Sequence, residues 1–189
     1  MLLGAILVLI WARLSGTPMR ALGFDLPKSW TVTIVAGIAL GAAFKVLMKA
    51  VVMPLLGADP INHTYQYLIG NTAALPAMLF TVIIGAGFGE EIVFRGFLFE
   101  RFSRLLGKGV WAMTIIVVLT STLFGLAHYW DQGLPGVQQA TIVGLVFGTV
   151  FAVTQRLWLL IVAHAAFDVT AVLIIYRNLE TFVAGLVFE

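Results

Sequence analysis

The strongest constraint on the fold of this chain is a succession of long apolar segments separated by short polar turns. Of its 189 residues, 61% are hydrophobic and only 11% are charged, and the mean hydropathy is +1.04. A soluble domain usually carries about a quarter charged residues. A helix that crosses a bilayer needs about 20 mostly apolar residues. The sequence therefore predicts an all-α, polytopic helical membrane protein.

The apolar segments predict about six to seven transmembrane helices. No internal repeat or linker divides them, so a single integral-membrane domain is expected over residues 1–189. The expected apolar segments cover residues 2–14, 29–56, about 71–106, 110–129, 137–154, 157–176 and 181–188. The expected connections include residues 57–70, 107–109, 131–136 and 155–156.

Composition also excludes several kinds of site. The chain has no cysteine, which rules out disulfides and thiolate metal ligands. Its net charge of +2 comes from few residues, so it does not indicate nucleic-acid binding. The partner expected from composition is the lipid bilayer itself.

The distribution of basic residues predicts the membrane orientation. Arg and Lys occur in the connections near 13–28, 101–108 and 155–156, and are absent from those near 57–70 and 130–136. These two groups alternate as successive connections should if the basic ones face the cytoplasm. Short loops without an appended domain are typical of a bacterial protein, so the bacterial inner (plasma) membrane is the expected location.

Three charged residues, Glu90, Glu91 and Arg95, stand together within an otherwise apolar helix. Ionisable residues at bilayer depth are costly, and they usually mark a functional site. On an ideal helix Glu91 and Arg95 point about 40° apart, whereas Glu90 and Arg95 point about 140° apart. Glu91 is therefore the expected partner of Arg95, and Glu90 is free for proton transfer. The alternative is that all three form a structural network between two helices.

Two histidines and an aspartate accompany these carboxylates. His164 and Asp168 are four residues apart and share a helical face. Counting from the 107–109 turn places Glu90 and His128 within roughly 3 Å of the same depth. His164 is expected to be shallower unless helices tilt or the third helix protrudes from the bilayer. Burial of so many titratable groups for packing alone would be expensive, which favours a site.

The remaining polar residues are expected to have other roles. Lys45 and Lys49 lie on one face of the second long segment, and the sequence places no carboxylate near them. We expect both to extend their ammonium groups toward the membrane surface. His63 lies in a polar loop, where a surface role is expected.

Together these residues resemble three motifs of the CPBP family of CAAX-type intramembrane endopeptidases, called the Abi family in bacteria. The resemblance covers about residues 85–170, and a catalytic core is expected over about 76–176. The motifs stand in order on successive helices, as Glu90-Glu91-x-x-x-Arg95, Phe124-x-x-x-His128 and His164-x-x-x-Asp168.

The resemblance implies hydrolysis of peptide bonds inside the membrane. If the roles known in the family apply at the matching positions, Glu90 is the general base, and His128 helps to hold and polarise the attacking water. His164 and the residue at 168 stabilise the oxyanion. Glu91 and Arg95 support the helix or bind substrate, and Phe124 is a supporting residue of the second motif.

Asp168 departs from the commoner family pattern, which has asparagine there. An ionised carboxylate cannot donate a hydrogen bond to an oxyanion. Asp168 is therefore protonated, or orients His164, or binds a metal. A metal-independent mechanism without cofactor is favoured. Zn²⁺ is the open alternative, with ligands drawn from Glu90, Glu91, His128, His164 and Asp168.

The expected function is that of a peptidase acting on membrane-anchored or hydrophobic peptides, including lipid-modified substrates of the CAAX type. Two alternatives stay open at this point. One is a non-catalytic membrane protein of the same fold, such as an immunity or scaffold protein. The other is a proton-coupled transporter that uses the same titratable residues as a relay, although no inverted repeat supports it.

Overall fold

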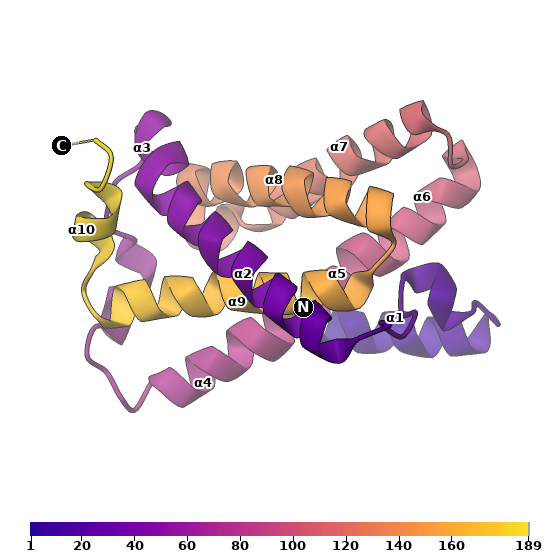
Figure 1. Cartoon of the computed structure of the whole chain (residues 1–189), viewed down its shortest axis with the longest axis horizontal. Coiled ribbons are helices and arrows are strands. Elements are labelled where there is room, and N and C mark those ends of the chain that lie inside the picture. Colours follow the sequence, from indigo (N-terminus) through magenta and orange to yellow (C-terminus); the bar gives the residue numbers. More distant parts are fainter. Residues whose placement is uncertain (189) are drawn as a thin grey trace.

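A computed structural model describes residues 1–188, and in these residues the regular structure is helical. Figure 1 shows the helices packed roughly along one long axis, with the C-terminus and α10 at one end. The α-helices are α1 (Leu2–Leu14), α2 (Trp30–Leu47), α3 (Met53–Leu55), α4 (Leu75–Phe80), α5 (Gly89–Glu91), α6 (Phe99–Leu106), α7 (Val110–Ala127), α8 (Tyr129–Thr154), α9 (Leu157–Tyr176) and α10 (Glu180–Ala184). Short 3-10 helices form at Met19–Leu22 and His63–Leu68, and π-helical segments at Met48–Val52, Thr81–Phe88 and Ile92–Leu98.

The helices confirm the predicted all-α membrane architecture. The π-helical segments join α2 to α3, and α4 to α5 and α6, into two long continuous helices. Five helices are long and apolar enough to cross a membrane, and α1 is a shorter apolar helix. The five are Trp30–Leu55, Leu75–Leu106, Val110–Ala127, Tyr129–Thr154 and Leu157–Tyr176.

The predicted loop at 131–136 is wrong in its extent. Helical backbone continues on both sides of Gly133, which alone has non-helical angles (φ 61°, ψ −156°). A positive φ is accessible to glycine without a steric penalty, so one residue is enough to make the bend. Pro135 then stands in the first turn after this kink, where its missing N–H is not needed. The apolar tail forms only the short helix α10.

Helix α2 packs along α9, and α7 packs along α8. Figure 1 shows α2 crossing in front of α9. Gly41 permits the first of these contacts, because a β-carbon there would overlap the backbone carbonyl of Ala163. Close approach of two backbones requires a residue without a side chain. This packing brings the middle of α9, which carries His164, into the centre of the bundle.

The helix that carries the Glu90 motif is unusually long. Leu75–Leu106 contains 32 residues and extends roughly 48 Å at 1.5 Å per residue, more than the ~30 Å apolar thickness of a bilayer. The third helix is therefore long enough to protrude, as the depth argument for His164 required. Its π-helical segments flank Gly89–Glu91 on both sides. Such wide turns often occur at functional sites.

The basic connections meet at one end of the bundle. The backbone N–H of Leu157 donates to the carbonyl of Gly23 (3.1 Å), which joins the α8–α9 connection to the segment before α2. The guanidinium of Arg101 lies 4.4 Å from the ring centre of Trp11 and ties α6 to α1. Figure 1 shows the α6–α7 turn and the α8–α9 connection at the end opposite to α10.

At the other end, Lys49 does not extend toward the surface as predicted. Its ammonium donates to Glu180 Oε1 (2.9 Å) and to the backbone carbonyl of Pro60. The same Glu180 oxygen accepts from the backbone N–H of Asn62 (3.1 Å). The prediction failed because Glu180 is distant in sequence, and only the fold brings α10 against the end of the second long helix.

Candidate functional site

Glu91 and Arg95 form the buried centre of the site. Arg95 Nη1 donates to Glu91 Oε1 (2.7 Å), as the helical spacing predicted, and both side chains are almost completely buried. The guanidinium also lies 4.7 Å from the ring centre of Phe124 and 5.9 Å from that of Phe147. Aromatic faces favour a nearby cation, so these rings help to stabilise the buried charge. The structure thus joins Glu91, Arg95 and Phe124 in one buried cluster, and their supporting role stays a prediction.

His164 joins this network from α9. Its Nδ1 lies 2.7 Å from Glu91 Oε1, and because that carboxylate oxygen also accepts from Arg95, we assign Nδ1 as the donor. A histidine whose Nδ1–H is held by a carboxylate has a fixed ring orientation. His164 Nε2 is then directed to the opposite side, 3.8 Å from Glu90 Oε2 and 3.5 Å from Asp168 Oδ2. His164 thus lies at the level of Glu90, the arrangement expected if the third helix protrudes from the bilayer.

Orientation of His164 by Asp168 was one of three roles considered for that aspartate, and the structure gives this role to Glu91 instead. The 3.5 Å separation of Asp168 from Nε2 is too long for a good hydrogen bond. The i, i+4 spacing correctly placed His164 and Asp168 on one face of α9. It could not identify the stronger partner, which lies 73 residues away.

Glu90 lies on the other side of its helix from Glu91 and lines a cavity of about 660 Å³. In residues 1–188 its Oε2 is buried without a hydrogen-bond partner. His128, His164 and Asp168 line the same cavity, whereas Glu91 and Arg95 do not. The fold therefore brings together the four residues predicted as catalytic. It separates the two adjacent glutamates into different environments.

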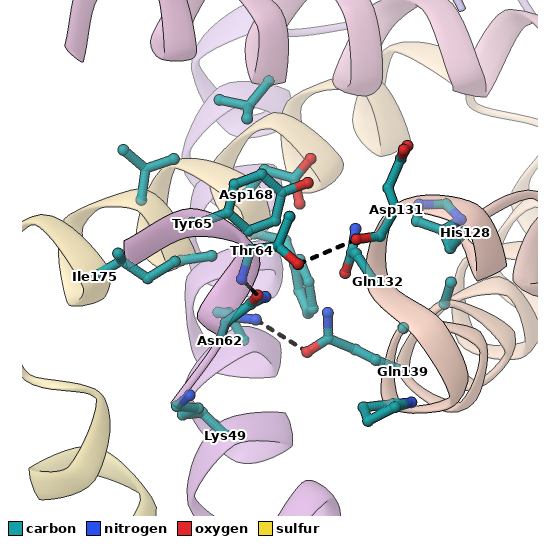
Figure 2. Close-up of a pocket in the computed structure, with 18 of the residues that line it drawn as sticks. Lys49, Asn62, Thr64, Tyr65, His128, Asp131, Gln132, Gln139, Asp168 and Ile175 are labelled. Carbon is teal, nitrogen blue, oxygen red and sulfur yellow. Dashed lines mark hydrogen bonds between the residues drawn. The ribbon is translucent and has the colours of Figure 1, made fainter. Parts of the chain in front are cut away.

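His128 occupies the break between α7 and α8. Its Nδ1 lies 2.8 Å from the backbone carbonyl of Phe124, to which it donates, and its ring packs edge-on against the Phe124 ring at 4.7 Å. These contacts leave Nε2 available on the cavity side. Figure 2 shows His128 and Asp168 on different helices around the pocket, with Gln132 and Gln139 also lining it.

Lys45 is a cavity residue that the sequence analysis assigned to the membrane surface. It is 93% buried, since only 7% of its surface is exposed, and Nζ donates to Gln139 Oε1 (3.0 Å). It also lies 4.9 Å from the ring centre of Phe167. Depth could have revealed this position, because Lys45 is 10 residues from Leu55, the nearer end of its helix, roughly 15 Å along the axis. That distance is beyond the reach of a lysine side chain.

The rim of the cavity is polar and includes the loop at 59–65. His63 is exposed, as predicted, and its Nε2 lies 3.1 Å from Asp59 Oδ2. The backbone N–H of Ile61 and then the His63 side chain hold the pKa of Asp59 below its ordinary value. Thr64 Oγ1 donates to the backbone carbonyl of Asp131 (3.1 Å), which connects this loop to α8 across the rim (Figure 2).

Of the five residues considered as zinc ligands, Glu90, His128, His164 and Asp168 line the cavity, and Glu91 does not. Across residues 1–188, no group of three or more His, Asp or Glu side chains is arranged to hold a metal ion. Glu91 Oε1 and His164 Nδ1 are committed to each other, and Glu91 is also paired with Arg95. A zinc site normally needs at least three protein ligands at about 2 Å. Glu91 is therefore not free to bind a metal, and the mechanism below uses none; chelation tests the zinc alternative.

Comparison with known proteins identifies the family. Residues 72–170, more than half of the chain, match the family described as type II CAAX prenyl endopeptidase Rce1-like. The chain belongs to the Rce1-like family. The matched region contains all three motifs, so the resemblance inferred from their residues is confirmed at the level of the family. The family and the long apolar helices together establish an integral membrane protein.

Two curated proteins resemble this Rce1-like chain in sequence over part of their length. The membrane-embedded CAAX protease MroQ of Staphylococcus aureus is 26% identical over 140 residues, covering 73% of this chain and 56% of MroQ. An uncharacterized 24.3 kDa protein of Escherichia coli is 29% identical over 110 residues, covering 49% of each chain. The chain thus spans about half the length of these relatives. No solved structure matches it.

Proposed function

We propose that this protein is an intramembrane endopeptidase that hydrolyses hydrophobic or membrane-anchored peptides with Glu90 as general base. The observation that carries the proposal is the state of Glu90. Its carboxylate lines a cavity, has a buried oxygen without a hydrogen-bond partner in residues 1–188, and faces His164 Nε2 at 3.8 Å. Glu91 also has one buried oxygen without a partner, but its other oxygen accepts from Arg95 and His164, as expected of a structural carboxylate. His164 Nε2 is beyond hydrogen-bond distance of Glu90 Oε2.

In the proposed reaction, Glu90 removes a proton from a water molecule, and the hydroxide attacks the carbonyl carbon of the scissile peptide. The carbonyl carbon becomes tetrahedral, and its oxygen becomes a negatively charged oxyanion. Because Glu91 holds Nδ1–H of His164, its Nε2 donates to the oxyanion when the ring is an imidazolium, and we propose this charged form. His128 donates Nδ1–H to the Phe124 carbonyl, so its neutral ring accepts a hydrogen bond from the attacking water through Nε2. Collapse of the intermediate breaks the C–N bond, and protonated Glu90 returns its proton to the departing amine. The carboxylic acid product then passes its proton to the amine, so the products are a carboxylate and an ammonium group, and Glu90 is again ionised.

Glu91 and Arg95 act on this reaction through His164. Glu91 holds the ring by Nδ1, so Nε2 stays directed at the region between Glu90 and Asp168. The contact between Glu91 and His164 fixes the hydrogen-bond donor before negative charge develops on the substrate. Such preorganisation is the main source of electrostatic catalysis. Asp168 would oppose an oxyanion if ionised, so we propose that it is protonated or turned toward Lys45 during the reaction.

The family description and the printed name of MroQ both refer to CAAX proteases. On this basis a lipid-modified peptide of the CAAX type is one substrate to test, alongside unmodified hydrophobic peptides. Both named relatives come from bacteria. We propose the bacterial inner membrane as the location.

The test uses purified protein in detergent with a fluorogenic farnesylated CAAX peptide and a panel of membrane-peptide substrates. Wild type, Glu90→Gln and His128→Ala are compared, each with and without a strong chelator. Glu100→Gln is the matched control, because Glu100 is a buried carboxylate on the same helix that pairs with Arg101 and Arg104 and does not line this cavity.

Cleavage by wild type and Glu100→Gln, lost in Glu90→Gln and unaffected by the chelator, is the expected result. Loss of cleavage on chelation, with recovery on added Zn²⁺, would contradict the metal-independent mechanism. If wild type cleaves nothing, protein termini are compared in cells that carry wild type or Glu90→Gln. Identical termini would replace the proposal with a non-catalytic role.

A further inference from the structure

The basic residues of the chain are concentrated at one end of the bundle. The short connections there join α1 to α2, α6 to α7, and α8 to α9. Seven of the eleven Lys and Arg residues lie in or beside these connections: Arg13, Arg20, Lys28, Arg101, Arg104, Lys108 and Arg156.

Contacts in the structure show that these three connections form one surface. The Leu157–Gly23 hydrogen bond and the Arg101–Trp11 contact link them in pairs. A second cavity, of about 510 Å³, is lined by residues from all three, including Ala21, Arg104, Lys108 and Gln155. We call this surface the basic end.

The Glu90 cavity opens at the other end. Six exposed residues of its lining lie in the 57–70 loop and at the start of α8, and we call them the mouth: Asp59, Pro60, His63, Thr64, Asp131 and Pro135. Met1, Thr81 and Ala127 are further exposed residues of the lining, on the helices beside it. The 57–70 loop and the start of α8 adjoin α10 and the end of α2–α3 rather than the basic end. Toward the basic end the cavity closes at the buried side chains of Phe124 and His164. The mouth is therefore the polar route by which a peptide reaches Glu90.

Few basic residues lie at the mouth end of the bundle. Lys49 and Arg177 are the basic residues near the mouth end, and Lys49 is paired with Glu180. Short connections rich in Lys and Arg remain on the cytoplasmic side, and the effect depends on these residues rather than on acidic ones. The difference of seven basic residues against two predicts a single orientation.

We propose that the Glu90 cavity opens on the membrane face away from the cytoplasm. The consequence for substrates rests on the proposed peptidase function. The substrate is then a peptide segment exported to that face, or anchored in the outer leaflet. The C-terminus of a prenylated protein that stays in the cytoplasm does not reach this mouth.

Cysteine labelling tests the orientation without any need for activity, and the chain has no cysteine of its own. Gln66→Cys places a thiol on the exposed His63–Leu68 helix, beside the mouth but outside the cavity lining. Lys108→Cys places one in the exposed α6–α7 turn at the basic end. Intact cells expressing each variant are treated with a membrane-impermeant maleimide, and permeabilised cells measure full labelling.

The expected result is near-complete labelling of Gln66→Cys in intact cells and labelling of Lys108→Cys only after permeabilisation. The opposite pattern, or labelling of both variants in intact cells, overturns the proposal. A second arm adds a cleavable peptide to sealed vesicles of known orientation. Right-side-out vesicles should cleave it at once, and inverted vesicles only after detergent.

The two proposals fail in distinguishable ways. Absence of cleavage even in detergent counts against the peptidase function, while the labelling still decides the side of the mouth. Cleavage by inverted vesicles and not by right-side-out ones would overturn the inferred substrate side and leave the peptidase function intact.

Discussion

The two glutamates of the central motif are adjacent in sequence, yet they lie in two different regions of the molecule. Glu91 has no exposed surface, and one of its oxygens accepts from both Arg95 and His164. Glu90 faces the cavity, and its side chain is 12% exposed. The first region is an ion-paired network between two helices, and the second is a carboxylate open to reactants.

The difference shows how one helix can place one carboxylate in a buried ion-paired network and the next at a cavity. A step of about 100° per residue turns neighbouring side chains to different faces. One face is buried by α9 and the other borders the cavity. Removal of a charge should therefore impair stability on one side and chemistry on the other.

The largest effect on activity is expected for Glu90→Gln. The amide cannot accept a proton from water, so kcat should fall about 10²- to 10⁴-fold, the usual contribution of a general base. Stability should be unchanged or slightly higher, since Glu90 has no hydrogen-bond partner to lose in residues 1–188. Peptide cleavage and thermal unfolding in detergent measure both. A large fall in stability would show that Glu90 is structural.

Glu91→Gln should produce the reverse pattern. The change leaves the guanidinium of Arg95 buried without its carboxylate, and removal of one partner of a buried ion pair costs about 3–5 kcal/mol. Unfolding in detergent should show this loss. Residual folded protein should keep more activity than Glu90→Gln, because the general base is still present. Equal stability of the two variants would contradict the division of roles.

Gly87→Val tests the close contact between the helix that carries Glu90 and Glu91 and helix α9. A β-carbon at Gly87 would lie 2.8 Å from the β-carbon of Ala165 and 2.9 Å from its backbone nitrogen. Displacement of the Glu90 helix from α9 should cost about 1–3 kcal/mol, as overpacking usually does, and should also reduce activity. Gly85→Val is a matched control for stability alone, because a β-carbon at Gly85 meets only Thr81 at 3.9 Å, whereas Gly85 itself lines the cavity. Similar losses of stability in the two variants would contradict the assignment.

Lys45→Met should have the smallest effect and sharpens the description of the cavity face. Methionine preserves the apolar stem and removes the ammonium that donates to Gln139. We expect a fall in kcat/KM of about tenfold, because Asp168 loses the ammonium toward which it can turn. Stability should change little, since the lost hydrogen bond, about 1.5–3 kcal/mol, is offset by removal of a charge that is costly to bury. Arg101→Met, at the basic end, is the control and should leave cleavage unaltered. Wild-type activity in Lys45→Met would exclude a role for the ammonium.

Much of this protein is determined by the sequence alone, because local periodicity and transfer free energy suffice. Apolar segments long enough for a bilayer identified the membrane helices, and the i, i+4 spacing identified the Glu91–Arg95 pair. The three motifs identified the family that residues 72–170 confirm. The assignment of Glu90, His128, His164 and Asp168 to catalysis stays a prediction, although the fold places all four around one cavity.

Only the tertiary structure decided which distant groups meet. Glu91, rather than Asp168, orients His164, and Glu180 pairs with Lys49, because helices separated by many residues pack side by side. Lys45 lines the cavity for the same reason. Contacts of this kind depend on the crossing of helices and on close approaches such as that at Gly41. Spacing within a single segment carries no information about them.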